Sequence, residues 1–213
     1  MSVNQKSSAV FLDRDGVIND IIFHEEMGII ETPFTAKQFR LLPHAAKAVR
    51  RLNCIGLKAV IASNQPGLAM RHFTEKALND ITRKMVRLLK KEGAALDGIY
   101  YCVCHPTKGY GRLRRNCPCR KPKPGLLKQA ARDLNIDLRT SYMVGDGIND
   151  IQAGKRAGCT TLLVGQVKLD WLRLMEKKGA KPDYIVKDLW EAARKIAAIE
   201  KRRLANRVRR PTR

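Results

Sequence analysis

The sequence predicts an α/β protein built on a mainly parallel β-sheet with helices on both faces. Short apolar runs alternate with longer stretches in which apolar residues recur at helical spacing, the pattern of parallel strands joined by helices. The chain has 213 residues, of which 44% are hydrophobic and 29% charged. This length and composition suit one domain with a sizeable core.

The first half of the chain supplies three of the expected strands and two of the helices. Residues 9–12 (AVFL) form a continuous apolar run that ends in acids, as expected of a buried strand. A second run at 57–62 leads into the polar turn SNQPG, and a third follows at 98–102. Helical spacing predicts helices at 43–53 and 74–92. Residues 20–40 are too few for a cap domain and too apolar for a disordered linker, so we expect a lid-like loop.

The second half begins with a loop rich in Gly, Pro, Cys and Arg that runs to residue 124. The same criteria then predict a helix at 125–134, a strand at 141–144, a short helix at 151–157, a strand at 160–164, a last strand at 184–186 and a final helix at 188–208. We expect one domain over residues 1–190, followed by a basic helix and tail over 191–213.

The net charge of +22 is unusually high. Nine basic residues and one acid lie within 194–213, and the rest of the chain still carries +14. Such a surface attracts phosphorylated substrates or nucleic acid, although a solvated basic tail is the simpler interpretation of the tail itself. The chain lacks the pattern of a signal peptide and has no apolar run long enough to cross a membrane. We therefore expect a cytoplasmic protein.

Two acids separated by one residue, Asp13 and Asp15, follow the first predicted strand. Ligand sites in parallel α/β sheets lie at the carboxyl ends of the strands, where this pair falls. Gly16 lets the chain turn sharply and re-aims the second side chain. One carboxylate can then attack phosphorus while the other handles the proton of the leaving group. Ordinary turn acids are the competing interpretation of the pair.

The segment FLDRDGV resembles the first motif of the haloacid dehalogenase (HAD) superfamily, Asp-x-Asp-Gly-[Thr/Val]. Three later segments are similar to the remaining motifs in the same order. They contain Ser63 after the second strand, Lys121 in CRKPKPG and Asp146 in VGDGIND. The resemblance covers the chain from about residue 10 to residue 164 and implies a Rossmann-like HAD fold without a large cap domain.

The resemblance also implies a magnesium-dependent phosphatase. Asp13 would be the nucleophile that forms an aspartyl-phosphate, and Asp15 would protonate the leaving alkoxide and then activate water. Ser63 would hold the transferring phosphoryl group, and Lys121 would neutralise the nucleophile and the phosphate. The ligands of Mg²⁺ would be Asp13, the backbone carbonyl of Asp15, and Asp146, which offer the oxygen atoms that this hard cation prefers.

Six cysteines include two Cys-x-Cys pairs that lie within eighteen residues. A chain without an export signal is not expected to carry a disulfide framework, and clustered thiols then indicate a metal. Thiolates bind zinc tetrahedrally, and a closed set of four ligands is structural. We expect a zinc ion held by Cys102, Cys104, Cys117 and Cys119, with His105 as the reserve ligand. The cysteines at 54 and 159 are expected in the core.

A zinc loop directly before Arg-Lys-Pro-x-Pro-Gly resembles the capless heptose-bisphosphate phosphatases and the related histidinol-phosphatase domain. The segments YYCVCHP and SYMVGD are similar to the heptose branch in particular. Three features depart from it: the first metal pair is Cys-x-Cys where the family has Cys-x-His, Met70 stands where a basic residue is usual, and the segment 21–32 looks longer. These departures leave the substrate more open than the chemistry.

The expected substrate is a small phosphorylated sugar, with heptose 1,7-bisphosphate as the first candidate. Histidinol phosphate is the second candidate, and the phosphorylated end of a nucleic acid is the third. The high positive charge favours a nucleic acid, but aromatic residues make up only 6% of the chain, so side chains for stacking bases are sparse. A zinc-loop nucleic-acid-binding protein with an inert core belongs to a different class, and the complete set of acids and lysine argues against it. The candidates for substrate binding are Asn64, Gln65, Arg120 and Lys121, and the resemblance implies a monomer.

Overall fold

The central sheet has six strands, and every neighbouring pair in it is parallel. The computed structural model describes residues 6–166 and 168–208. In spatial order the strands are β5 (Gly98–Cys102), β4 (Lys58–Asn64), β1 (Ala9–Leu12), β6 (Tyr142–Gly145), β7 (Thr160–Val164) and β8 (Tyr184–Val186). The predicted α/β fold with a parallel sheet is confirmed.

Strand β1 lies at the centre of the sheet, between β4 and β6. From β1 the chain first builds one side of the sheet through β4 and β5, and then returns to build the other side through β6, β7 and β8. A ligand crevice in such a sheet forms where the strand order reverses, beyond the carboxyl ends of the strands. The topology therefore places this crevice at the ends of β1, β4 and β6.

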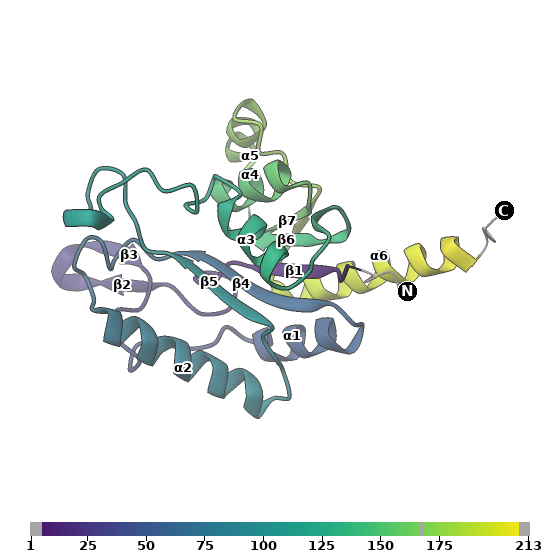
Figure 1. Ribbon diagram of the computed structural model, residues 1–213, viewed down its shortest axis with the longest axis horizontal. Coiled ribbons are helices and arrows are strands. Elements are labelled where there is room, and N and C mark those ends of the chain that lie inside the picture. The colour runs from purple at the N-terminus through teal and green to yellow at the C-terminus, as the bar shows by residue number, and fades with distance from the viewer. Residues whose placement is uncertain (1–5, 167, 209–213) are drawn as a thin grey trace.

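Helices cover both faces of the sheet (Figure 1). One face carries α1 (Ala45–Cys54), α2 (Glu75–Lys91) and α6 (Leu189–Val208), and the other carries α3 (Gly125–Asp133), α4 (Ile148–Ala157) and α5 (Leu169–Lys177). The central strand is buried on both faces because its residues alternate between two cores. Val10 and Leu12 pack with the residues of α1, α2 and α6, whereas Ala9 and Phe11 pack with those of α3.

Three local expectations differ from the structure. Residues 20–40, expected as a loop, contain an antiparallel hairpin of β2 (Ile22–His24) and β3 (Ile29–Glu31), whose strands are too short to give a periodic pattern. Helix α5 was not predicted, although its apolar residues recur at helical spacing; Met175 is the one that it buries. Cys54 is exposed at the end of α1 rather than in the core, whereas Cys159 is buried as expected.

Helix α6 crosses the expected boundary at residue 190. Its first half belongs to the core, where Ala192, Ala193 and Ile196 are buried. Its second half extends away from the sheet (Figure 1) and carries exposed basic residues such as Lys201 and Arg202. Residues 209–213 of the basic tail lie outside the described residues. Within the described ranges, none of the helices is long and apolar enough to cross a membrane.

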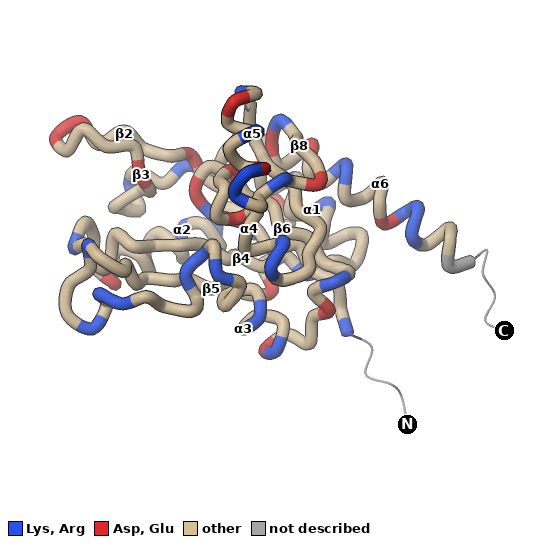
Figure 2. Tube along the Cα trace, turned by 90° about the horizontal axis from the view of Figure 1, so that it is seen from above, with Lys and Arg blue, Asp and Glu red and all other residues tan. Residues whose placement is uncertain are grey.

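The distribution of charge is uneven along the chain. Basic residues are spread over most elements, whereas the turn between β2 and β3 carries a cluster of acids (Figure 2). The solvent-facing side of the same hairpin is apolar, because Phe23 and Ile30 pair across the two strands and both are exposed. The hairpin therefore differs in charge and polarity from the basic body beneath it.

We predict that Met85→Ala destabilises the protein by about 2–5 kcal/mol, because Met85 is fully buried in the core beneath α2. Val86 is next to it on the same helix and is exposed, so Val86→Ala is the matched control and should change the free energy of unfolding by less than about 0.5 kcal/mol. Denaturant unfolding of the two variants measures the difference. Equal stabilities would show that α2 does not pack on the sheet as described.

Candidate active site

The carboxyl ends of the three central strands bring together the residues that the sequence singled out. The backbone N–H of Asp13 donates to the carbonyl of Val144, so the pairing of β1 with β6 continues to this residue. Ser63 lies near the end of β4, and Asp146 follows β6. A cavity of about 460 Å³ at this edge is lined by Asp13, Asp15, Ser63, Asn64, Arg120, Lys121, Asp146 and Asp150, and by residues 30–32 of the hairpin segment.

Lys121 is buried among the acids although its side chain carries a charge. Its Nζ lies 3.0 Å from Asp13 Oδ1 and also pairs with Asp150 Oδ1. Burial by itself lowers the pKa of Lys121, but the two carboxylates outweigh it and the pKa is raised. The lysine is therefore held in its charged form beside Asp13, as expected for a group that neutralises an anionic nucleophile and its phosphate.

Three carboxylates form a cluster at the same place. One oxygen from each of Asp13, Asp146 and Asp150 lies within 4.8 Å of the others. Burial and the neighbouring charges of Asp13 and Asp150 raise the pKa of Asp146 to about 7. Gly16 makes this approach possible, because a Cβ at that position would clash with Asp146 Oδ2 and the backbone has a φ of +76°. Repelling oxygens at such short range fit a divalent cation.

Asp150 is the one member of the cluster that the sequence analysis did not identify. It is buried, its Oδ1 accepts a hydrogen bond from Lys121 Nζ, and its Oδ2 accepts one from the backbone N–H of Gly147 at 3.1 Å. The residue thus caps helix α4 and fixes the lysine at once. Its position four residues after Asp146, within the same motif, was the available signal.

The candidates for substrate binding divide into two groups. Asn64 and Arg120 line the cavity, but each also stabilises a loop. The side chain of Asn64 donates to the carbonyl of Lys121 at 3.1 Å and accepts from its N–H at 3.0 Å, and Arg120 Nη1 donates to the carbonyl of Cys104 at 3.2 Å. Gln65 is buried and donates to Asp15 and to Ser63. It therefore links two of the predicted catalytic side chains through hydrogen bonds.

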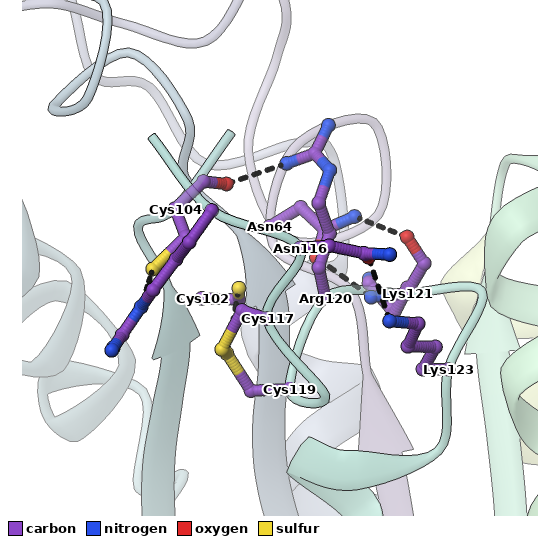
Figure 3. The surroundings of a disulfide bond; sticks show 10 residues. Asn64, Cys102, Cys104, Asn116, Cys117, Cys119, Arg120, Lys121 and Lys123 are labelled. Atoms are coloured by element: carbon purple, nitrogen blue, oxygen red, sulfur yellow. Dashed lines mark hydrogen bonds between the residues drawn. A yellow bond between two sulfur atoms is a disulfide. The ribbon is translucent and has the colours of Figure 1, made fainter. Parts of the chain in front are cut away.

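The two Cys-x-Cys pairs meet beside this site (Figure 3). The sulfur atoms of Cys102, Cys104 and Cys117 lie within 4.8 Å of one another, and Cys119 Sγ lies 2.7 Å from Cys102 Sγ. In the structure Cys117 and Cys119 are joined by a disulfide, in place of the free thiols expected from the sequence. A disulfide sulfur is not a thiolate ligand, so only the reduced pair could complete a metal site. The cluster is consistent with a zinc site.

His105, the expected reserve ligand, has another contact. Its Nδ1 accepts hydrogen bonds from the backbone N–H groups of Thr107 and Lys108, at 3.2 Å and 2.8 Å. The imidazole therefore closes the turn that follows the first cysteine pair. This contact gives His105 a role in the loop, and the donor set of the metal stays a prediction.

Comparison with known proteins agrees with this geometry. Residues 118–192 match the family model described as HAD-hydrolase-like. The D-glycero-beta-D-manno-heptose-1,7-bisphosphate 7-phosphatase of Pasteurella multocida is 43% identical over 149 residues, which cover 70% of this chain and 76% of that protein. The protein of the same name from Yersinia pestis is 36% identical over 180 residues, covering 80% of this chain and 92% of that protein.

Solved structures support the same family assignment. The crystal structure of D,D-heptose 1,7-bisphosphate phosphatase from B. bronchiseptica, complexed with magnesium and phosphate, is similar with a TM-score of 0.73 and 32% identity, over 90% of this chain and 98% of that one. The corresponding enzyme from Burkholderia thailandensis gives a TM-score of 0.61 and 26% identity, over 90% and 99% of the two chains. The chain therefore belongs to the D-glycero-beta-D-manno-heptose-1,7-bisphosphate 7-phosphatase family of the HAD superfamily.

Proposed function

We propose that this protein is a phosphomonoesterase that removes the 7-phosphate of D-glycero-D-manno-heptose 1,7-bisphosphate. The observation that carries the proposal is the cavity in which Asp13, Asp15, Ser63 and Lys121 converge, in a chain 43% identical to a phosphatase of that name. The names of the relatives specify the beta anomer, and the panel of substrates described below tests this preference. The expected cytoplasmic location and monomeric state stay predictions.

The contacts of Asp13 suggest how it acts as the nucleophile. Its Oδ1 accepts the backbone N–H of Arg14 at 2.7 Å and pairs with Lys121, so we assign Oδ2 to the attack on phosphorus. Lys121 and the hydroxyl of Ser63 would hold the transferring phosphoryl group. Asp15 would donate its proton to the leaving sugar oxygen, and would then remove a proton from the water that hydrolyses the aspartyl-phosphate.

Magnesium fits the acidic cluster, and we assign its ligands to Asp13, Asp146 and the backbone carbonyl of Asp15. Asp150 is a supporting residue in this assignment, because both of its oxygens already accept hydrogen bonds from the protein. When bound, Mg²⁺ would offset the repulsion between the carboxylates and the phosphate dianion. Burial, together with the repulsion of Asp13 and Asp150, raises the pKa of Asp146, and this gathering of acids supports the site.

The loop between the cysteine pairs is a candidate for binding the second phosphate of the substrate. It carries four basic residues, Lys108, Arg112, Arg114 and Arg115, and the forked guanidinium group suits phosphate oxygens. The hydrogen bond between Arg120 and Cys104 joins this loop to the edge of the cavity. We propose that the loop contributes the contacts that distinguish a bisphosphate from a monophosphate.

We further propose that Cys102, Cys104, Cys117 and Cys119 hold a structural zinc ion when reduced. The support is a donor set of four sulfur atoms gathered from two short segments, of which three are buried. The segment 117–119 ends two residues before Lys121, so a metal at this point would fix the start of the catalytic loop. The ion would supply stability, and the reaction would use none of its coordination positions.

The function predicts a preference among phosphate esters, because the family's substrate is a bisphosphorylated sugar. We expect kcat/KM with magnesium to be highest for one anomer of heptose 1,7-bisphosphate, by at least about 100-fold over histidinol phosphate and over a 3′-phosphorylated oligonucleotide. Steady-state phosphate release across this panel measures the preference. A higher kcat/KM for the oligonucleotide would overturn the sugar assignment and make the charge of +22 the functional clue.

The control for this assay is a variant without the nucleophile. Asp13→Asn should retain the fold and lose phosphate release by a factor of at least about 1,000, because the neutral amide cannot form the aspartyl-phosphate. Asp170→Asn is the matched carboxylate-to-amide change on exposed α5 and should leave the rate unchanged. Wild-type turnover by Asp13→Asn would refute the nucleophile assignment.

The raised pKa of Asp146 predicts that magnesium binding depends on pH. Below about pH 7 this carboxyl is protonated and must release its proton to bind the cation, so the affinity should fall about tenfold per pH unit. Calorimetry at pH 6 and pH 8.5, in buffers of different ionisation enthalpy, measures both affinity and protons released. Asp146→Asn should remove most of the pH dependence along with much of the affinity, and a wild-type affinity that does not vary with pH would argue against the site.

The same shift has a consequence for the metal-free protein. The folded state binds this proton more tightly than the unfolded chain, in which the pKa is near 3.8. The carboxyl therefore favours folding at pH below 4, and this contribution is lost as the pH rises through about 7. Added Mg²⁺ should recover stability mainly above pH 7, where the cluster is fully charged.

The zinc assignment predicts that Cys117→Ser, prepared under reducing conditions, contains less zinc and unfolds at a lower temperature. The rate of the folded fraction should change much less than its stability, since the metal takes no part in the reaction. Cys54→Ser alters an exposed thiol and is the matched control. Elemental analysis and thermal unfolding provide the readouts. Full zinc content in Cys117→Ser would remove this residue from the donor set.

A further inference from the structure

Arg14 is fully buried beside the acid–base residue Asp15, and it lies between the two aspartates of the first motif. Its Nε and Nη2 donate to Asp15 Oδ1 at 3.2 Å and 3.0 Å, and Nη2 also donates to Gln65 Oε1 at 2.8 Å and to Thr32 Oγ1. A buried guanidinium is costly unless its donors are paired. The partners of Arg14 therefore mark a polar network built around the carboxylate of Asp15.

Further donors complete the network. Asp15 Oδ1 accepts hydrogen bonds from Thr32 Oγ1 at 2.8 Å and from Asn19 Nδ2 at 2.9 Å. Asp15 Oδ2 accepts one from Gln65 Nε2 at 2.6 Å. Each oxygen thus has its own side-chain donor in addition to the arginine. The plane and the position of the carboxylate are fixed from several directions.

Thr32 differs from the other donors in where it comes from. Arg14 and Asn19 follow β1, and Gln65 follows β4, so these residues belong to the sheet edge. Thr32 follows β3 and belongs to the hairpin segment that lines the cavity. The hydroxyl accepts a hydrogen bond from Arg14 and donates its own proton to Asp15. The hairpin segment therefore contacts Asp15 through the hydroxyl of Thr32.

The position of Thr32 is itself fixed. The residue is 5% exposed, and its carbonyl is 3.0 Å from Nε2 of the buried His24, on the opposite strand of the hairpin. The His24 ring stacks on Phe34, with centroids 3.7 Å apart. The base of the hairpin is thus packed against the protein, while its outer face, with Phe23 and Ile30, is exposed.

We propose that Thr32 is a positioning residue for Asp15. Proton transfer from Asp15 then depends on the packing of the hairpin that carries Thr32. The proposal rests on the proposed phosphatase function. As Asp13 forms its bond to phosphorus and the bond to the leaving oxygen breaks, the proton of Asp15 must pass to that oxygen. Thr32 holds the carboxyl in the orientation from which this transfer occurs. It does so only while the hairpin is packed against the protein as described above.

The leaving group distinguishes this role from a structural one. An alkoxide from a sugar or a simple alcohol needs the proton, whereas p-nitrophenolate is stable enough to leave without it. The ratio kcat/KM reports formation of the aspartyl-phosphate, in which the leaving group departs, and is independent of its later hydrolysis. Loss of the Thr32 hydroxyl should therefore slow alkyl phosphates and spare the aryl phosphate.

The test uses Thr32→Val, which keeps the shape of the side chain and removes the hydroxyl. We expect kcat/KM to fall about tenfold or more for the best alkyl phosphate of the wild-type enzyme, and by less than about twofold for p-nitrophenyl phosphate. Thr32→Ser keeps the hydroxyl and should recover most of the alkyl rate. Thr35→Val is the matched control, because exposed Thr35 contacts Gln38 in the next turn and should leave both rates unchanged.

Turnover of p-nitrophenyl phosphate also shows that the variant is folded. Thr32→Ala, which likewise lacks the hydroxyl, serves as a second variant. Equal losses on both substrates, or an unchanged alkyl rate, would overturn the proposal in favour of a structural role. Failure of Thr32→Ser to recover the alkyl rate would also count against it. A wild-type enzyme that hydrolyses the aryl ester and no alkyl ester would instead overturn the proposed function, and with it the need for a positioned acid.

Discussion

The active site depends on one buried cation held among acids that repel one another. Asp13, Asp146 and Asp150 bring carboxylate oxygens within 4.8 Å, and such a cluster is unfavourable without positive charge. Lys121 provides that charge from inside the protein, through its pairs with Asp13 and Asp150. Removing one partner of a buried pair leaves an unpaired charge, so the geometry of each acid depends on the lysine.

The position of Lys121 depends in turn on the segment that precedes it. Asn64, at the end of β4, donates a hydrogen bond to the backbone carbonyl of Lys121 and accepts one from its backbone N–H. These two bonds fix the loop to the sheet. On the other side the chain reaches the cysteine cluster within two residues, and Arg120 bonds the carbonyl of Cys104. The sulfur cluster and Lys121 are therefore neighbouring parts of one loop. In this arrangement a metal at the cysteines would act on catalysis only through the position of the loop.

A second network holds Asp15, the proposed acid–base residue, apart from this cluster. Asp15 is surrounded by donors, with Arg14 at their centre, while Asp13 faces Lys121 and the acids. Two aspartates separated by one residue are thus each paired with a different buried cation, Asp13 with Lys121 and Asp15 with Arg14.

The fold class, the order of the four motifs along the chain and most of the candidate site residues were predictable from the sequence alone. Asp13 and Asp15 stand out because they are acids at the end of the first apolar run. Ser63, Lys121 and Asp146 could be identified through the resemblance of their segments to the later HAD motifs. Tertiary structure alone decided what depends on contacts between distant segments. Asp150 became a partner of Lys121 across 29 residues, and Thr32 became a partner of Asp15 from a hairpin too short to predict. The physical reason is that hydrogen bonds and ion pairs are formed in space, whereas periodicity and motifs record only neighbours along the chain.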